Sequence, residues 1–192
     1  MPKNVGTVVK DSTGSFKVVD ATQGDAKVEY TAPVSKKTKK VSVPDVVTVD
    51  GVEYKVTKVA DNAFKKNSTI TSVKIGENVT EIGKSAFSGC TKLKTVKLNS
   101  NLTKINKNAF YGCKTIKSII IPKNVKEIGT NAFYGCKNLK QVTIKSTKLT
   151  KIGSRAFKGI KSSARFKVPS KKYNAYKKLL KNKIPSKALV KK

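Results

Sequence analysis

The sequence predicts a solenoid, mainly β with short helical turns, that is built from 23-residue repeats and closed by a cap at each end. Three observations predict it: a recurring Ala-Phe pair, apolar columns that keep register between copies, and flanking segments that lack the repeat. A fixed period of this length indicates one supersecondary unit stacked on copies of itself. The pair recurs in steps of 23 residues, with a last step of 24, at Ala63-Phe64, Ala86-Phe87, Ala109-Phe110, Ala132-Phe133 and Ala156-Phe157.

Each repeat carries one predicted strand. The segments LKTVKL, IKSIII and LKQVTI alternate apolar and other residues with period two, which is typical of short strands. Strands of successive copies would stack in parallel, about 4.8 Å apart. The extra residue of the last copy lies between Ile144 and Leu149, in a turn that accepts it without shifting the apolar columns.

A short helical turn is expected to carry each Ala-Phe pair inward. Two residues before Phe the chain has Asn62, Ser85, Asn108, Asn131 and Arg155. The Asn and Ser side chains can cap the free amides of such a turn. Two residues after Phe the chain has Gly89, Gly112, Gly135 and Gly159, where a left-handed residue would end the turn.

Residues 1–55 are expected to form an N-terminal β cap with one partial repeat. They do not fit the repeat, but they contain short alternating runs separated by glycine turns. Val41 and Val43 resemble the strand of a first, incomplete copy. Asp50-Gly51 then suits the tight primed turn of a β-hairpin.

The repeats occupy residues 56–168, and residues 169–192 are expected to form a helical cap. Tyr173, Tyr176 and Leu180 make one apolar stripe on a helix over residues 171–182, which Pro185 would stop. Terminal repeats need such caps for solubility. We therefore expect a single domain over residues 1–192.

The repeat itself resembles a known family. The segments EIGKSAFSGCTKLKTVKL and IPKNVKEIGTNAFYGCKNLKQVTI are similar to leucine-rich repeats of BspA type, which are found in bacterial surface proteins. The similarity covers residues 41–168. It implies a leucine-rich-repeat solenoid that serves in binding or adhesion, often as a module of a larger chain, with no catalytic residues and no cofactor. The last copy departs from the pattern, with Ile160 in the Cys slot and Ser163 in the Leu slot, as expected next to a cap.

The resemblance also implies a secreted or cell-surface location. The segment MPKNVGTVVK lacks the apolar core of a signal peptide, so we expect that a leader has been trimmed. No stretch approaches the length of a transmembrane helix, and we expect no membrane insertion.

The charge is strongly basic and unevenly distributed. The chain has 42 Lys plus Arg against 11 Asp plus Glu, a formal charge of +31, and no acidic residue follows Glu127. Such a field attracts polyanions and weakens with salt. Scarce Arg and absent Trp disfavour nucleic acid. The two remaining interpretations are an anionic wall or host polymer or an extracellular protein as partner, and lysines that only keep the solenoid soluble.

If one face binds, the strand face is the natural choice, because stacked strands present a continuous surface. We expect it to be basic and polar, without a pocket, and with Ile120 as an apolar exception; an ordinary solvated face is the alternative. The candidate ligand-binding residues are Lys74, Lys94, Lys97, Lys117, Ile120, Lys140, Gln141, Arg165 and Lys167.

Cys90, Cys113 and Cys136 occupy one slot of three successive repeats. Equivalent positions in adjacent rungs have parallel side chains at about the strand spacing, whereas a disulfide needs Cβ atoms about 3.8 Å apart. With no histidine in the chain, a zinc site lacks a usual ligand. We therefore interpret all three as unpaired core thiols and expect no metal.

Catalysis is not indicated. The chain has no histidine, which is the commonest general base. Glu81 and Glu127 occupy the same position of repeats two rungs apart, rather than facing each other across a cleft. Tyr111 and Tyr134 follow Phe in adjacent copies and either cover the turn or form a sugar or peptide platform.

The sequence thus predicts a non-enzymatic surface binding or adhesion module that uses an extended basic face. The alternative is a structural spacer or wall-anchoring module with no ligand of its own.

Overall fold

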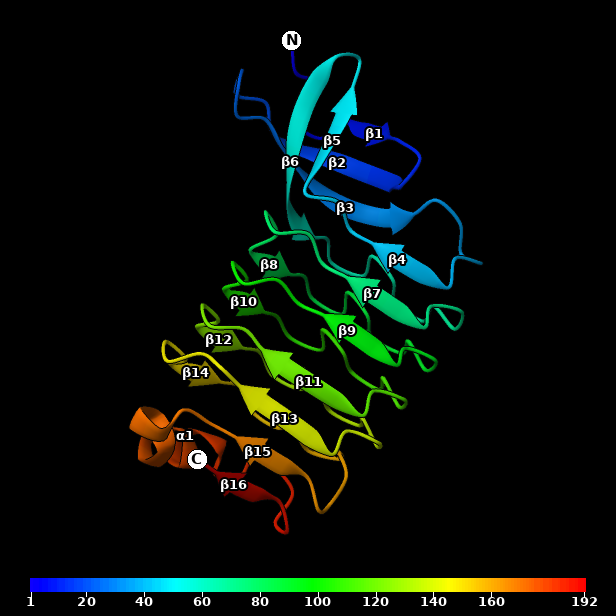
Figure 1. Cartoon of the computed structure of the whole chain (residues 1–192). Coiled ribbons are helices and arrows are strands. Elements are labelled where there is room, and N and C mark those ends of the chain that lie inside the picture. Colours follow the sequence, from blue (N-terminus) through cyan, green and yellow to red (C-terminus); the bar gives the residue numbers. More distant parts are fainter.

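A computed structural model describes residues 1–192 and shows a β-solenoid whose rungs stack along one axis (Figure 1). One face of the stack, which we call the front sheet, consists of two parallel ladders, β4-β7-β9 and β11-β13-β15-β16, with pairs such as Ile119 with Val142. Its strands are β4 (Lys40–Ser42), β7 (Ser72–Lys74), β9 (Thr95–Lys97), β11 (Ser118–Ile121), β13 (Gln141–Ile144), β15 (Arg165–Lys167) and β16 (Leu189–Lys191). The predicted strands LKTVKL, IKSIII and LKQVTI are β9, β11 and β13.

A second parallel ladder, the back sheet, lies on the far side of the rungs. Its repeat strands have only two residues each and were not predicted. They are β8 (Glu81–Ile82), β10 (Lys104–Ile105), β12 (Glu127–Ile128) and β14 (Lys151–Ile152). One residue of each pair is buried and its neighbour faces outward, so the back sheet also contributes to the core.

The N-terminal cap continues the back sheet. Strands β1 (Val8–Lys10), β2 (Gly14–Asp20) and β3 (Lys27–Pro33) are antiparallel, and β3 pairs in parallel with β6 (Val52–Val59), which leads into β8. Strand β5 (Val46–Val49) pairs with β6 across a hairpin, with Asp50 at φ 52° and Gly51 at φ 75°. Two positive φ values identify the primed turn that Asp50-Gly51 predicts.

A third hydrogen-bonded edge runs through the Ala-Phe pairs. The N–H of Phe87 donates to the carbonyl of Ala109 in the next rung at 2.8 Å, and Phe64, Phe110 and Phe133 repeat this bond. The predicted Asn and Ser caps are wrong. Asn108 and Asn131 have φ of 57° and 55°, and their side-chain oxygens accept no hydrogen bond. Asn serves here because it tolerates the left-handed backbone. The glycines two residues after Phe are left-handed, as predicted, with φ of 67–76°.

A single aromatic stack fills the centre of the solenoid. Tyr30 and the five Phe of the Ala-Phe pairs stack with centroids 4.8–5.5 Å apart and rings within 13° of parallel. Phe16 closes one end edge-on at 86°, and Phe166 closes the other at 85°. All eight of these rings are almost fully buried, so the apolar columns do face one core.

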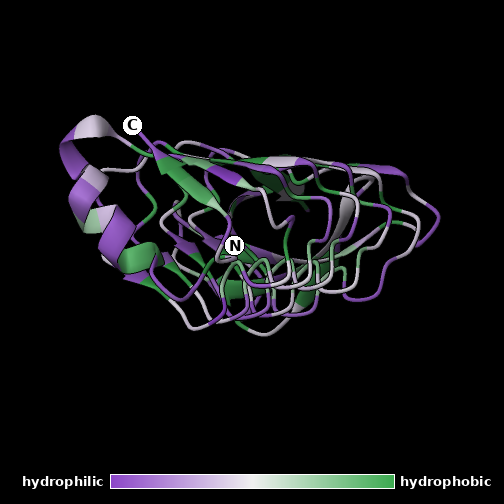
Figure 2. Cartoon of the chain, turned by 90° about the horizontal axis from the view of Figure 1, so that it is seen from below, coloured by the Kyte–Doolittle hydropathy of each residue, from purple (hydrophilic) through white to green (hydrophobic).

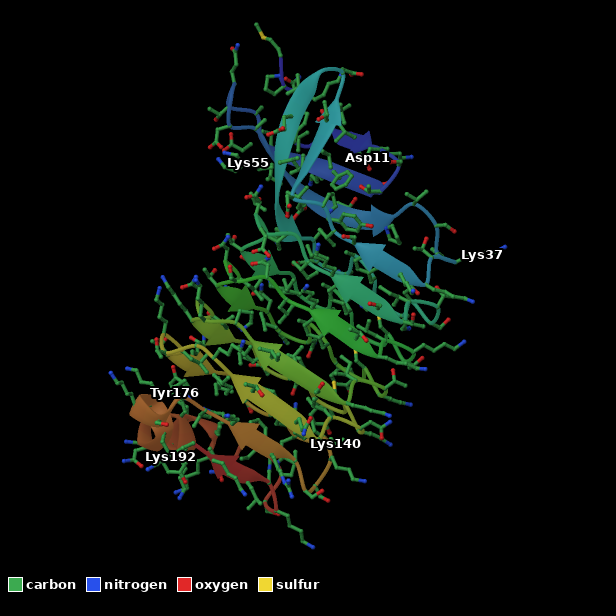
Figure 3. The ribbon with its side chains drawn as sticks, viewed as in Figure 1. Asp11, Lys37, Lys55, Lys140, Tyr176 and Lys192 are labelled. Atoms are coloured by element: carbon green, nitrogen blue, oxygen red, sulfur yellow. The ribbon has the colours of Figure 1, made fainter.

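The C-terminal cap combines a helix with one more strand. After a 3-10 turn (Ser170–Lys172), helix α1 (Tyr173–Leu180) lies at one side of the last rung (Figure 2). The hydroxyl of Tyr176, labelled in Figure 3, accepts the N–H of Leu149 at 3.0 Å, and the carbonyl of Lys183 accepts the N–H of Phe157 at 2.9 Å. The helix ends at Leu180, before Pro185. No helix has the length and apolar character needed to cross a membrane.

Candidate binding face

The front sheet brings all nine predicted site residues to one exposed face. Along each strand the residues alternate between the core and the outer face. The register places Lys74 beside Lys97, and Gln141 beside Arg165. Lys117 and Lys140 stand at the same level of successive rungs, since the N–H of Lys140 donates to the carbonyl of Lys117 at 3.0 Å. Ile120, in the middle, is 51% exposed.

The face extends one strand further than the sequence predicted. Strand β16 pairs with β15 and sets Lys191 beside Lys167 and Leu189 beside Arg165. Strand β16 lies outside the 23-residue repeat, so the period of the repeat could not predict it. Its alternating "ALVKK" was the only local signal.

Charges are compensated on the back sheet and uncompensated on the front. Back-sheet positions alternate in sign from rung to rung, and Lys151 lies 2.9 Å from Glu127, which is also 3.9 Å from Lys104. None of the nine front-face residues forms an ion pair. In Figure 3 side-chain nitrogens, including that of Lys140, surround the lower rungs. The front face is therefore an uncompensated cationic surface.

The front sheet is interrupted between β9 and β11. Strands β4, β7 and β9 form one ladder, β11, β13, β15 and β16 form another, and no residues pair across the junction. In the neighbouring rung the N–H of Lys145 donates to the carbonyl of Ile121 at 2.9 Å. Pro122 holds the corresponding position at the junction and has no N–H to donate. Just before the start of β11, the hydroxyl of Thr115 donates a hydrogen bond to the carbonyl of Leu93 at 2.7 Å.

A groove of about 590 Å³ lies at this interruption, so the expectation of a face without a pocket is wrong. We call it the β9–β11 groove. Val96 and Leu98 are only half-buried there, although their counterparts Val73 and Ile75 in the preceding rung are buried. The residues that define the groove are Val96, Leu98, Ile120, Lys97, Lys123 and Lys145. The proline in IKSIIIPK was the only sequence signal of the groove. It was not enough to predict the groove, because one absent donor does not by itself show that strands separate.

The cysteines lie in the core and take no part in this face. Cys90, Cys113 and Cys136 are buried, and each thiol lies 3.0–3.1 Å from a Phe carbonyl oxygen in the preceding rung. Burial raises the pKa of Cys90 and Cys136 to about 12, and it raises the pKa of Cys113 well above its usual range. Thiols in this state are weak nucleophiles.

The two tyrosines stack on the outside of the Ala-Phe edge. The rings of Tyr111 and Tyr134 are 5.3 Å apart and nearly parallel, and the Arg155 guanidinium lies 5.7 Å from the Tyr134 ring centroid. Tyr111 is 41% exposed. Nothing else converges on this pair, so we assign it to the covering of the turns.

Comparison with known proteins identifies a family and several solved structures that are similar to this chain. The family model of the BspA type leucine rich repeat region matches residues 57–185 in six copies. No match is found among the curated proteins. The structure is similar to that of a leucine-rich repeat protein of T. pallidum, with 25% identity, a TM-score of 0.69, and coverage of 91% of this chain and 83% of that one.

Two further solved structures share the fold. A leucine-rich repeat protein from Bacteroides capillosus is 29% identical, with a TM-score of 0.56 and coverage of 76% of this chain and 96% of that one. A leucine-rich cell surface protein from Faecalibacterium prausnitzii is 24% identical, with a TM-score of 0.57 and coverage of 97% of this chain and 51% of that one. Since the family model spans most of the chain and the repeats form the expected solenoid, this protein belongs to the BspA type leucine-rich repeat family.

Proposed function

We propose that this chain is a non-enzymatic binding module that acts at a bacterial cell surface and engages an anionic polymer or an extracellular protein through its front sheet. The observation that carries the proposal is the charge difference between the two sheets. Lysines on the back sheet are matched by Glu81 and Glu127, whereas lysines on the front face have no acidic partner. Lysines that served only solubility would have no reason to differ between the faces.

The surface location is supported by the family, and by one protein of the same fold that is described as a cell surface protein. Binding rather than catalysis is supported by the residues available. The chain has no histidine, and Glu81 and Glu127 stand on the back sheet among lysines. An extended face of point charges suits a flexible polyanion, because lysine imposes little geometry on its partner.

The test is a binding screen of the purified chain against wall teichoic acid, mucin glycans, extracellular-matrix proteins and duplex DNA, at about 50 and 300 mM salt. We expect saturable binding to one non-nucleic-acid class that persists at the higher salt. Equal binding to every polyanion at low salt, with none at high salt, would contradict the proposal and favour a spacer without a ligand of its own.

A further inference from the structure

The β9–β11 groove contains unpaired backbone donors as well as apolar surface. In the preceding rung the N–H of Ile75 donates to the carbonyl of Lys97 at 2.9 Å, across the sheet. The N–H of Leu98 holds the same position and faces β11, but it forms no hydrogen bond. The N–H of Lys117, which faces β9, forms none either, although the N–H of Lys140 bonds to the rung before it. Two amide donors therefore point into the gap from opposite sides.

The remaining lining combines apolar and cationic groups. Val96, Leu98 and Ile120 supply the apolar part, and Lys94, Lys97, Lys123 and Lys145 surround it. No lining residue is acidic. One carboxylate lies at the rim, that of exposed Glu77, whose Oε2 is 3.4 Å from the hydroxyl of Ser100. A matching ligand needs an apolar side chain, hydrogen-bond acceptors for the two amides, and negative charge.

We propose that the β9–β11 groove binds a short acidic peptide segment of a partner protein in extended conformation. An apolar side chain of the peptide enters between β9 and β11, peptide carbonyls accept the free N–H groups of Leu98 and Lys117, and flanking carboxylates face the lysines. Extended peptides commonly pair with exposed strand edges while alternate side chains enter pockets. The volume of about 590 Å³ lies within the range of specific ligand sites.

Charge complementarity selects this occupant. A second copy of the chain is strongly cationic, with +31 overall, and would be repelled. A polysaccharide offers negative charge but no apolar side chain for Val96 and Ile120. The inference rests on the proposed surface function in assuming a partner outside the cell, and it adds acidic protein segments as the partner class of this one site.

The experiment uses fluorescence anisotropy with the whole chain and a labelled peptide of alternating Asp and Leu. A matched peptide of alternating Asp and Ser carries the same charge without the apolar side chains. At physiological salt we expect the Asp-Leu peptide to bind about tenfold more tightly, which corresponds to one partly buried apolar side chain. Equal affinity for the two peptides would overturn the proposal, because charge alone would then explain the binding.

Two variants locate the site. Ile120→Ser should weaken binding of the Asp-Leu peptide about tenfold, whereas Leu189→Ser should leave it unchanged. Leu189 is a matched control because it lies on the same sheet and is 50% exposed, against 51% for Ile120. Both variants should fold, since neither side chain is buried. Glu77→Gln should strengthen binding about twofold by removing a carboxylate at the rim. Equal losses in Ile120→Ser and Leu189→Ser would place the peptide elsewhere and contradict the groove.

The same experiment separates the two proposals. If anionic polymers bind but the two peptides are not distinguished, the groove is wrong and the function of the front face stands. If the Asp-Leu peptide binds in an Ile120-dependent way and no polymer or matrix protein binds, the groove stands and the function of the face fails.

Discussion

At the scale of single residues, the fold depends on a few positions that repeat in each rung. Phe supplies the central stack, and Ala fits beside it. Asn provides a left-handed backbone that most side chains disfavour. The apolar positions could be predicted from the sequence because one column recurs five times. The role of Asn could not, because the same residue type suits a cap and a left-handed turn equally.

We predict that Phe110→Ala lowers the free energy of unfolding by about 3–5 kcal/mol, because it removes a fully buried ring and leaves a cavity in a packed core. Phe110 stacks on Phe87 at 5.1 Å and on Phe133 at 5.2 Å, so both neighbours lose a contact. Urea unfolding followed by circular dichroism measures the change. Ile120→Ala, which alters an exposed side chain, is the control and should be nearly neutral. Similar losses in both variants would mean that the stack does not carry the core.

At the scale of elements, alternation predicted the front strands, the Asp50-Gly51 pair predicted the hairpin, and the helical spacing of Tyr173, Tyr176 and Leu180 predicted the helix of the C-terminal cap. The back sheet escaped prediction because a strand of two residues contains no period to detect. The interruption between β9 and β11 escaped because it depends on two rungs together. Pro122 removes one donor, and the N–H groups of Leu98 and Lys117 at the neighbouring strand ends are also unpaired.

We predict that amide hydrogen exchange marks this interruption directly. The N–H groups of Leu98 and Lys117 should exchange faster than those of their paired counterparts Ile75 and Lys140, because only the latter are hydrogen-bonded to a neighbouring rung. Exchange measured residue by residue with NMR compares the four amides in one sample. If Leu98 and Lys117 were as protected as Ile75 and Lys140, the front sheet would be continuous and the groove would be closed.

At the scale of the whole molecule, the solenoid separates its two tasks between two sheets. The back sheet contains the ion pairs between repeats, in which Lys58, Lys104 and Lys151 contact Glu81 or Glu127. The front sheet has the uncompensated lysines and the groove. Rungs that stack in register bring Lys74 beside Lys97 and Lys117 beside Lys140, so a long ligand would meet repeated weak contacts rather than one deep site. The total charge could be read from the sequence. How the charge is divided between the two sheets could not, because the back sheet was not predicted.

The most direct test of this division compares two sets of lysine variants that change the net charge equally. One chain carries Lys74→Gln, Lys140→Gln and Lys167→Gln on the front face, away from the groove. The control carries Lys84→Gln, Lys107→Gln and Lys126→Gln, which are exposed lysines on the other side of the rungs and in no ion pair.

Titration of both triple variants against the polymer or matrix protein that the unmodified chain binds provides the measurement. We expect the front variant to lose affinity on the order of tenfold at low salt, with little change in the control, because clustered charge acts locally. Equal losses in the two variants would show that only the total charge matters, and they would contradict the assignment of binding to the front face.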